Sequence, residues 1–147
     1  MPTAGKLIAF VLFGALAWYA SKLVMTYMET GTEPPFYAEV NALIGAVMGW
    51  LIAGSRVRGP WMAAISYGLT AVLATIFWWL FLHAFYAMII ASMRGLYGSD
   101  PTMAVVDVFR LMMDSAQLMA HPDVVTVFVA GAVICGLVTE WVGRRLN

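Results

Sequence analysis

The sequence predicts an all-α integral membrane protein with four transmembrane helices and one amphipathic helix on the periplasmic surface. Hydrophobic residues make up 63% of the chain, charged residues make up 11%, and the mean hydropathy is +0.85. Soluble domains carry about 25% charged residues. Residues 59–93 contain no Asp, Glu, Lys or Arg, and about 20 apolar helical residues suffice to cross a bilayer. We therefore expect residues 1–147 to form a single integral membrane domain.

The first span is expected at about residues 7–28. Lys22 lies near its end, where a long side chain can reach the polar interface. A signal peptide is the alternative for this segment, because a basic residue precedes the apolar run. The apolar sequence continues far enough to span, which favours a transmembrane helix.

The second span is expected at about residues 35–54, with Pro35 placed to start the helix. Asn41, Gly45 and Gly49 recur every four residues and so share one helix face. Small residues let two membrane helices approach closely, and an amide can hydrogen-bond across the contact. This stripe predicts a packing face.

The third span is expected at about residues 60–86, with Pro60 in its first turn. The side of the helix that carries Gly68 also carries other small residues, and this pattern predicts a second packing face. Its members are Ala64, Gly68, Ala71 and Thr75.

Asp100 and Pro101 give a strong helix start signal, and residues 101–120 are amphipathic. Such a helix is expected on the membrane surface or across the end of the bundle. Its apolar face is formed by Val105, Phe109, Met112, Ala116 and Met119, with Val106 and Met113 beside them.

The fourth span is expected at about residues 123–142. Ala132, Gly136 and Glu140 share one face, which predicts a third packing face.

The distribution of basic residues predicts the orientation. Four spans place five basic residues on the side of both termini and three on the other side. Because cytoplasmic segments carry the excess of Lys and Arg, we expect both termini in the cytoplasm. The five are Lys6, Arg56, Arg58, Arg144 and Arg145, and the three are Lys22, Arg94 and Arg110.

Glu39 together with Asn41 is the first candidate functional site, because an ionisable residue at membrane depth needs a partner. The alternative is that Glu39 is an interfacial carboxylate favoured by the positive end of the helix dipole, with Asn41 serving only helix packing.

His83 and His121 are expected at similar depth near the outer interface. Two histidines on neighbouring helices could ligate a haem or share a metal. No further ligand motif accompanies them, so we interpret them as interfacial residues with unrelated hydrogen bonds. No cofactor and no metal are expected.

Glu140 could be an inward-facing carboxylate, and Arg144 four residues later is its simplest partner. The sequence contains no nucleophile–base motif and no phosphate-binding glycine loop. We therefore expect no enzymatic activity and no catalytic residues. The absence of a basic cluster larger than two residues argues against nucleic acid as a partner.

Several phrases of the chain together resemble the TrgA family of small alphaproteobacterial membrane proteins. The phrases are residues 38–45, residues 81–86, residues 117–119, Glu140-Trp141 and Arg144-Arg145. The resemblance covers nearly the whole chain. It implies a four-span inner-membrane protein associated with tellurite resistance.

Two other roles remain open. The small-residue faces would suit an accessory subunit of a larger bioenergetic membrane complex, or a homo-oligomer. A small oligomeric transporter or channel would need polar groups that meet in a path. The lipid bilayer is the one partner that every alternative requires.

Overall fold

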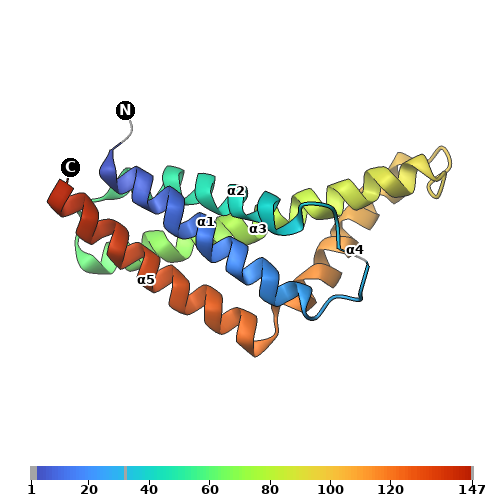
Figure 1. Cartoon of the computed structure of the whole chain (residues 1–147). Coiled ribbons are helices and arrows are strands. Elements are labelled where there is room, and N and C mark those ends of the chain that lie inside the picture. The colour runs from blue at the N-terminus through green and yellow to red at the C-terminus, as the bar shows by residue number, and fades with distance from the viewer. Residues whose placement is uncertain (1–2, 32, 147) are drawn as a thin grey trace.

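The computed structural model describes residues 3–31 and 33–146, which form helices joined by short turns and loops. Four helices are long and apolar enough to cross a membrane, and a fifth lies between the third and fourth of them. The predicted fold class is therefore confirmed. The start of the first helix, the end of the last helix and the turn at residues 57–60 lie at one end, which we call the terminal end (Figure 1). The connection at residues 94–100 lies at the opposite end, which we call the hairpin end.

Helix α1 (Ala4–Met25) begins and ends three residues before the predicted span 7–28. It begins early because the Thr3 hydroxyl accepts a hydrogen bond from the Lys6 amide at 3.4 Å and caps the first turn. Lys22 lies in the last turn, with its ammonium 5.3 Å from the centre of the Trp18 ring.

Helix α2 (Tyr37–Met48) starts two residues later than predicted, because Phe36 has a left-handed backbone with φ 57° that no helix can include. The helix then continues through a π-helical turn, η1 (Gly49–Ala53), and a 3₁₀ turn, η2 (Gly54–Arg56). Together they form a span of 20 residues, Tyr37–Arg56.

Helix α3 (Trp61–Met93) has 33 residues and runs past the predicted end at residue 86. Nothing breaks it before Gly95, which has φ 75°. At 1.5 Å per residue the helix is about 50 Å long, against about 30 Å for a bilayer core. Its last turns therefore extend beyond the other spans (Figure 1).

Helix α4 (Pro101–Met119) begins where the sequence predicts, with the Asp100 carboxylate accepting from the Thr102 amide at 3.0 Å. It folds back along α3. Val108 and Met119 are its buried residues, and most of the predicted apolar face is exposed on the surface of the bundle. The exposed apolar residues of α4 include Val105, Val106, Phe109 and Met113.

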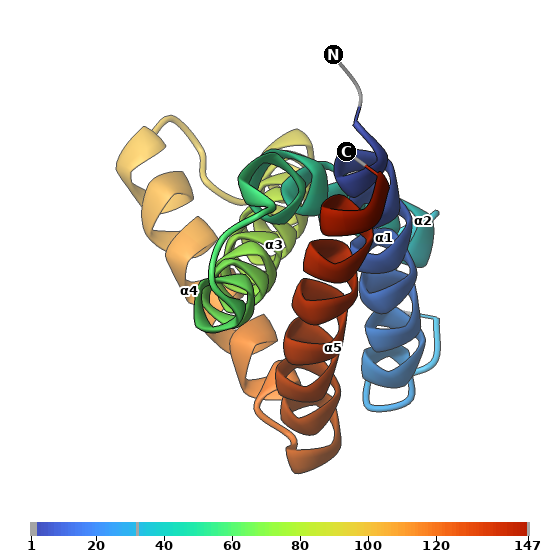
Figure 2. The ribbon, with the colours of Figure 1, turned by 90° about the vertical axis from the view of Figure 1, so that its left-hand side faces the viewer.

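The last span is α5 (Pro122–Leu146), which contacts both α1 and α3. Figure 2 shows it between these two helices. It is longer than the predicted 123–142 because the helix continues through Arg144 and Arg145 to Leu146.

All three predicted packing faces lie at helix contacts. A Cβ on Gly45 would lie 2.5 Å from the Phe13 carbonyl oxygen of α1, and one on Gly49 would lie 2.7 Å from that of Ala9. Gly68 meets the Ala132 backbone in the same way, and a Cβ on Gly136 would lie 2.5 Å from the carbonyl oxygen of Ala64. Only glycine permits such close approach, so α1 pairs with α2 and α3 with α5.

Candidate functional site

The buried polar side chains of the described residues fall mainly into two clusters. The first is near the hairpin end and consists of Ser21, Tyr37, Asn41, Trp79 and His83. We call it the neutral cluster, because its only titratable members are a tyrosine and a histidine. The second is at the terminal end and is built around Glu140, and we call it the charged cluster.

A chain of hydrogen bonds joins α1, α2 and α3 in the neutral cluster. The Ser21 hydroxyl donates to the Ala17 carbonyl at 2.7 Å. Its oxygen can therefore accept from Asn41 Nδ2, which lies at 3.1 Å. Asn41 Oδ1 lies 2.8 Å from His83 Nε2. The Asn41 side chain is fully buried, so these bonds replace the water that its amide would otherwise need.

The order of donors fixes the tautomer of His83. Because Asn41 uses its amide nitrogen on Ser21, its oxygen faces the histidine and requires a proton on Nε2. A neutral imidazole then keeps Nδ1 as a hydrogen-bond acceptor. The cluster thus holds His83 in one orientation, with Nε2 as the hydrogen-bond donor.

Tyr37 and Trp79 complete the neutral cluster. The Trp79 indole donates to the Tyr37 hydroxyl oxygen at 2.8 Å, and both side chains are buried. The Tyr37 ring lies 4.6 Å from the His83 ring and 5.7 Å from the Trp79 ring, measured between centroids. Aromatic contacts on two sides therefore fix the position of Tyr37.

The structure does not join Glu39 to Asn41. Glu39 is exposed in the first turn of α2, whereas Asn41 is fully buried. Residues two apart on a helix point to roughly opposite faces, which explains the separation. The site expected around both residues is centred on Asn41 and His83 instead.

The two histidines have separate partners. His83 bonds to Asn41, whereas His121 Nδ1 donates to the Leu118 carbonyl at 2.8 Å and its ring stacks on Tyr27 at 4.0 Å. The Tyr27 hydroxyl donates to Asp123 at 2.6 Å, and this bond raises the pKa of Tyr27 above its ordinary value. Across residues 3–31 and 33–146, no three His, Cys, Asp or Glu side chains come together as a metal site would require.

Glu140 lies at the centre of the charged cluster, with its side chain almost fully buried. Its Oε1 accepts from Arg144 Nε at 2.6 Å, the pair expected from their spacing. Its Oε2 accepts from the Arg58 backbone amide at 2.9 Å. Arg144 also donates to the Gly59 carbonyl, and its guanidinium lies 4.6 Å from the centre of the Trp61 ring. Both carboxylate oxygens are therefore used to hold the end of α5 against the start of α3.

Two hollows lie beside His83. One is a cavity of about 170 Å³ between α1, α2, α3 and α4, with Tyr37, Trp79, His83 and Ser115 among its lining residues. The other is a surface hollow formed partly by Val40, Leu82 and Tyr86, and His83 lines both. His83 thus stands between the interior cavity and the outer face of the bundle.

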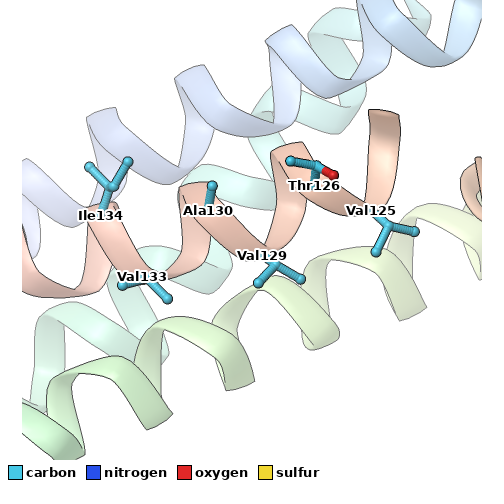
Figure 3. A pocket seen from close by; sticks show the side chains of 6 residues that line it. All are labelled: Val125, Thr126, Val129, Ala130, Val133 and Ile134. Carbon is cyan, nitrogen blue, oxygen red and sulfur yellow. The ribbon is translucent and has the colours of Figure 1, made fainter. Parts of the chain in front are cut away.

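A further groove runs along α5 (Figure 3). Its labelled lining residues all belong to that helix, and Thr126 is the only polar one among them. The Thr126 hydroxyl donates to the Pro122 carbonyl at 2.7 Å, so it offers little to a ligand. We assign this groove to the apolar outer surface of the span.

Sequence reasoning missed Ser21, Tyr37 and Trp79 as members of the neutral cluster. Ser21 is one of the few polar residues of the first span, which is the signal that could have drawn attention to it. Tyr37 and Trp79 resemble ordinary interfacial aromatics, and their spacing in the sequence does not predict the hydrogen bond between them. Comparison of the chain with family models, with curated proteins and with solved structures found no match.

Proposed function

We propose that this chain is a non-enzymatic protein of the bacterial inner membrane that contributes to tellurite tolerance. The resemblance to the TrgA family supports the association with tellurite. The observation that supports a non-enzymatic role is that the buried polar groups at the centres of the two clusters are bonded to one another or to neighbouring protein groups. Asn41 is bonded to Ser21 and His83, and Glu140 is bonded to Arg144 and Arg58. Such groups stabilise a fold rather than activate a nucleophile.

The proposed topology places both termini in the cytoplasm. The five basic residues of the terminal end outnumber the three of the other segments, which favours the terminal end as the cytoplasmic one. Reporter fusions after Arg58 and after Arg145 should both give cytoplasmic activity, and a fusion after Gly31 should give periplasmic activity. A periplasmic signal after Arg145 would contradict this topology.

The test of the tolerance role is growth in tellurite with and without the chain, in cells whose membrane abundance of the protein is measured. Wild-type protein should raise the tellurite concentration that permits growth. Gly45→Leu, which should accumulate to a lower level, shows whether tolerance follows the abundance of folded protein. Equal growth of cells with abundant protein and cells without it would overturn the proposed role.

An accessory subunit of a larger membrane complex is the second candidate. Helix α3 has the smallest buried share of the four spans. Phe77, Phe81 and Phe85 form a ladder along it, with stacked neighbouring rings 6.2 Å and 5.9 Å apart. An aromatic ladder of this kind offers a rigid apolar surface to another transmembrane helix. Gentle detergent purification followed by native mass measurement should find partner subunits. A mass equal to the monomer would rule this candidate out.

A further inference from the structure

The cavity beside His83 has the chemistry of a ligand site. Its walls come from four helices and the loop after α1, and none of its lining residues is Asp, Glu, Lys or Arg. Most of its surface is aliphatic or aromatic, with Tyr37, His83 and Ser115 as the main polar side chains. An apolar site with a few polar groups is the usual composition of a small-molecule pocket.

Size and charge narrow the class of ligand. A cavity of roughly 150 Å³ can hold a benzene ring, so about 170 Å³ accommodates one six-membered ring with small substituents. A charged ligand would find no opposite charge in the walls and would lose its hydration. A tellurium oxyanion is therefore a poor occupant, and an uncharged ring is a good one.

The hydrogen-bond donors of the cavity narrow the class of ligand further. The Tyr37 hydroxyl oxygen accepts from Trp79, so its own proton remains to be donated. Ser115 adds a second hydroxyl. These donors match a ligand that carries a carbonyl or hydroxyl oxygen.

The surroundings indicate how such a ligand would arrive. The hollow on the other side of His83 is bordered by Val40, Leu82 and Tyr86, all exposed on the outer surface of the spans. Pro34 and Pro35 of the loop before α2 also line this hollow, so it lies at the end of the spans, where hydrocarbon meets the membrane interface. A ring compound that partitions into the membrane can reach His83 from this side.

We propose that the cavity beside His83 binds an uncharged, lipid-soluble ring compound that carries a carbonyl or hydroxyl oxygen, of the quinone or phenol class. The Tyr37 hydroxyl donates to the ligand oxygen, and Trp79 and the aliphatic walls contact the ring. This site goes beyond the proposed role in tellurite tolerance and does not depend on it.

The test is calorimetric titration of the full chain in lipid nanodiscs with a decyl-substituted benzoquinone. Empty nanodiscs of the same lipid measure simple partition. We expect saturable binding of one molecule per chain above the empty-disc signal. Decylbenzene has the same tail and ring without oxygens, and it should bind about fivefold to tenfold more weakly, as expected for the loss of one neutral hydrogen bond. Partition identical to that in empty nanodiscs would overturn the proposal.

Two variants locate the binding. Ser115→Leu fills the cavity from α4 and should abolish the saturable signal, whereas Gln117→Leu places the same side chain at an exposed position of α4 and should leave it unchanged. Equal binding by both variants would show that the ligand lies elsewhere.

Tyr37→Phe keeps the aromatic ring and removes the donor, which provides an independent test if Ser115→Leu does not fold. It should weaken binding about fivefold. Tyr19→Phe, at an exposed position on α1, is its control. An unchanged affinity in Tyr37→Phe would contradict the assigned hydrogen bond and with it the class of ligand.

Discussion

The two polar clusters lie toward opposite ends of the same bundle, and their buried polar groups are satisfied by different kinds of partner. The charged cluster surrounds one carboxylate with a guanidinium and a backbone amide, in the last turns of α5. The neutral cluster uses an amide, a hydroxyl and an imidazole, and it is embedded among three helices. A charge is tolerated where an arginine can still reach water, and Arg144 is 40% exposed. Asn41 of the neutral cluster is fully buried among the helices, and uncharged groups can pair there without the cost of burying a charge.

The two clusters also differ in role: the charged cluster holds α5 against the start of α3, whereas the neutral cluster can bind a ligand. Each Glu140 oxygen is occupied by a protein donor. In the neutral cluster, Tyr37 retains a proton to donate and His83 borders two hollows. Changes at the charged cluster should therefore affect mainly stability, whereas changes at the neutral cluster should also affect ligand binding.

Gly45→Leu should have the largest effect, because it separates α1 from α2 and so breaks the Ser21–Asn41 bond of the neutral cluster. The new side chain meets the Phe13 backbone, which cannot rotate away. We expect a loss of at least about 3 kcal/mol of unfolding free energy, measured by unfolding in mixed detergent micelles. Val47→Leu, at an exposed position of the same helix, is the control. A folded Gly45→Leu protein with normal stability would show that α1 and α2 do not touch here.

Arg144→Leu should come next, because it leaves the Glu140 carboxylate buried with only the Arg58 amide as partner. The partial exposure of Arg144 reduces the effect, and we expect a loss of about 2 kcal/mol. Adding Glu140→Gln should recover part of that stability by removing the charge. Arg145→Leu, at an exposed position, serves as control. If the double variant were less stable than Arg144→Leu alone, Arg144 would not stabilise the protein by pairing with the Glu140 charge.

Asn41→Leu should cost about 1–2 kcal/mol, because Ser21 and His83 lose a shared partner inside the bundle. Glu39→Leu, two residues earlier on the exposed face of α2, should change stability by less than about 0.5 kcal/mol. The comparison measures how differently the two residues are placed. Equal losses at both positions would restore Glu39 as a member of the site.

Tyr27→Phe should have the smallest effect on stability, because this tyrosine is only half-buried, in the turn after α1, and the variant keeps the ring that stacks on His121. Its bond to Asp123 raises its pKa, so that bond contributes stability below the ordinary tyrosine pKa of about 10 and loses it as pH rises through the raised value. In an ultraviolet titration, subtracting the Tyr27→Phe curve from the wild-type curve should leave one tyrosine that ionises above pH 10. Ionisation of that tyrosine at the ordinary value would show that the bond is absent in solution.

The helices could be predicted from the sequence because membrane spans and small-residue faces follow from local composition. The sequence does not show which helix packs against each small-residue face. The Asn41, Gly45 and Gly49 stripe predicts a close contact, but which helix fills it depends on the positions of Ser21 and Phe13 in another span. Periodicity likewise predicts the apolar face of α4, but it does not tell which of the residues on that face the bundle covers. In a soluble protein an apolar stripe packs inward, whereas in a membrane Val105 and Phe109 can face lipid instead.

The candidate site was only partly predictable. His83 and Asn41 were identified separately, because each is a polar residue within or near a span. Their bond joins residues that are 42 positions apart, and no periodicity links two helices across such a separation. Glu39 attracted attention because charge in a membrane is conspicuous, but an exposed first-turn position can keep a carboxylate in contact with the interface.

A double-mutant cycle between Asn41 and His83 tests the neutral cluster most directly. The unfolding free energies of wild type, Asn41→Ala, His83→Ala and the double variant are measured in the same detergent mixture, together with a parallel cycle between Glu39 and His83. We predict a coupling of about 0.5–1.5 kcal/mol for Asn41 with His83, as expected for a hydrogen bond between membrane helices. Glu39 and His83 should be additive within about 0.3 kcal/mol. Additivity of Asn41 and His83 would contradict the bond on which the neutral cluster and its cavity depend.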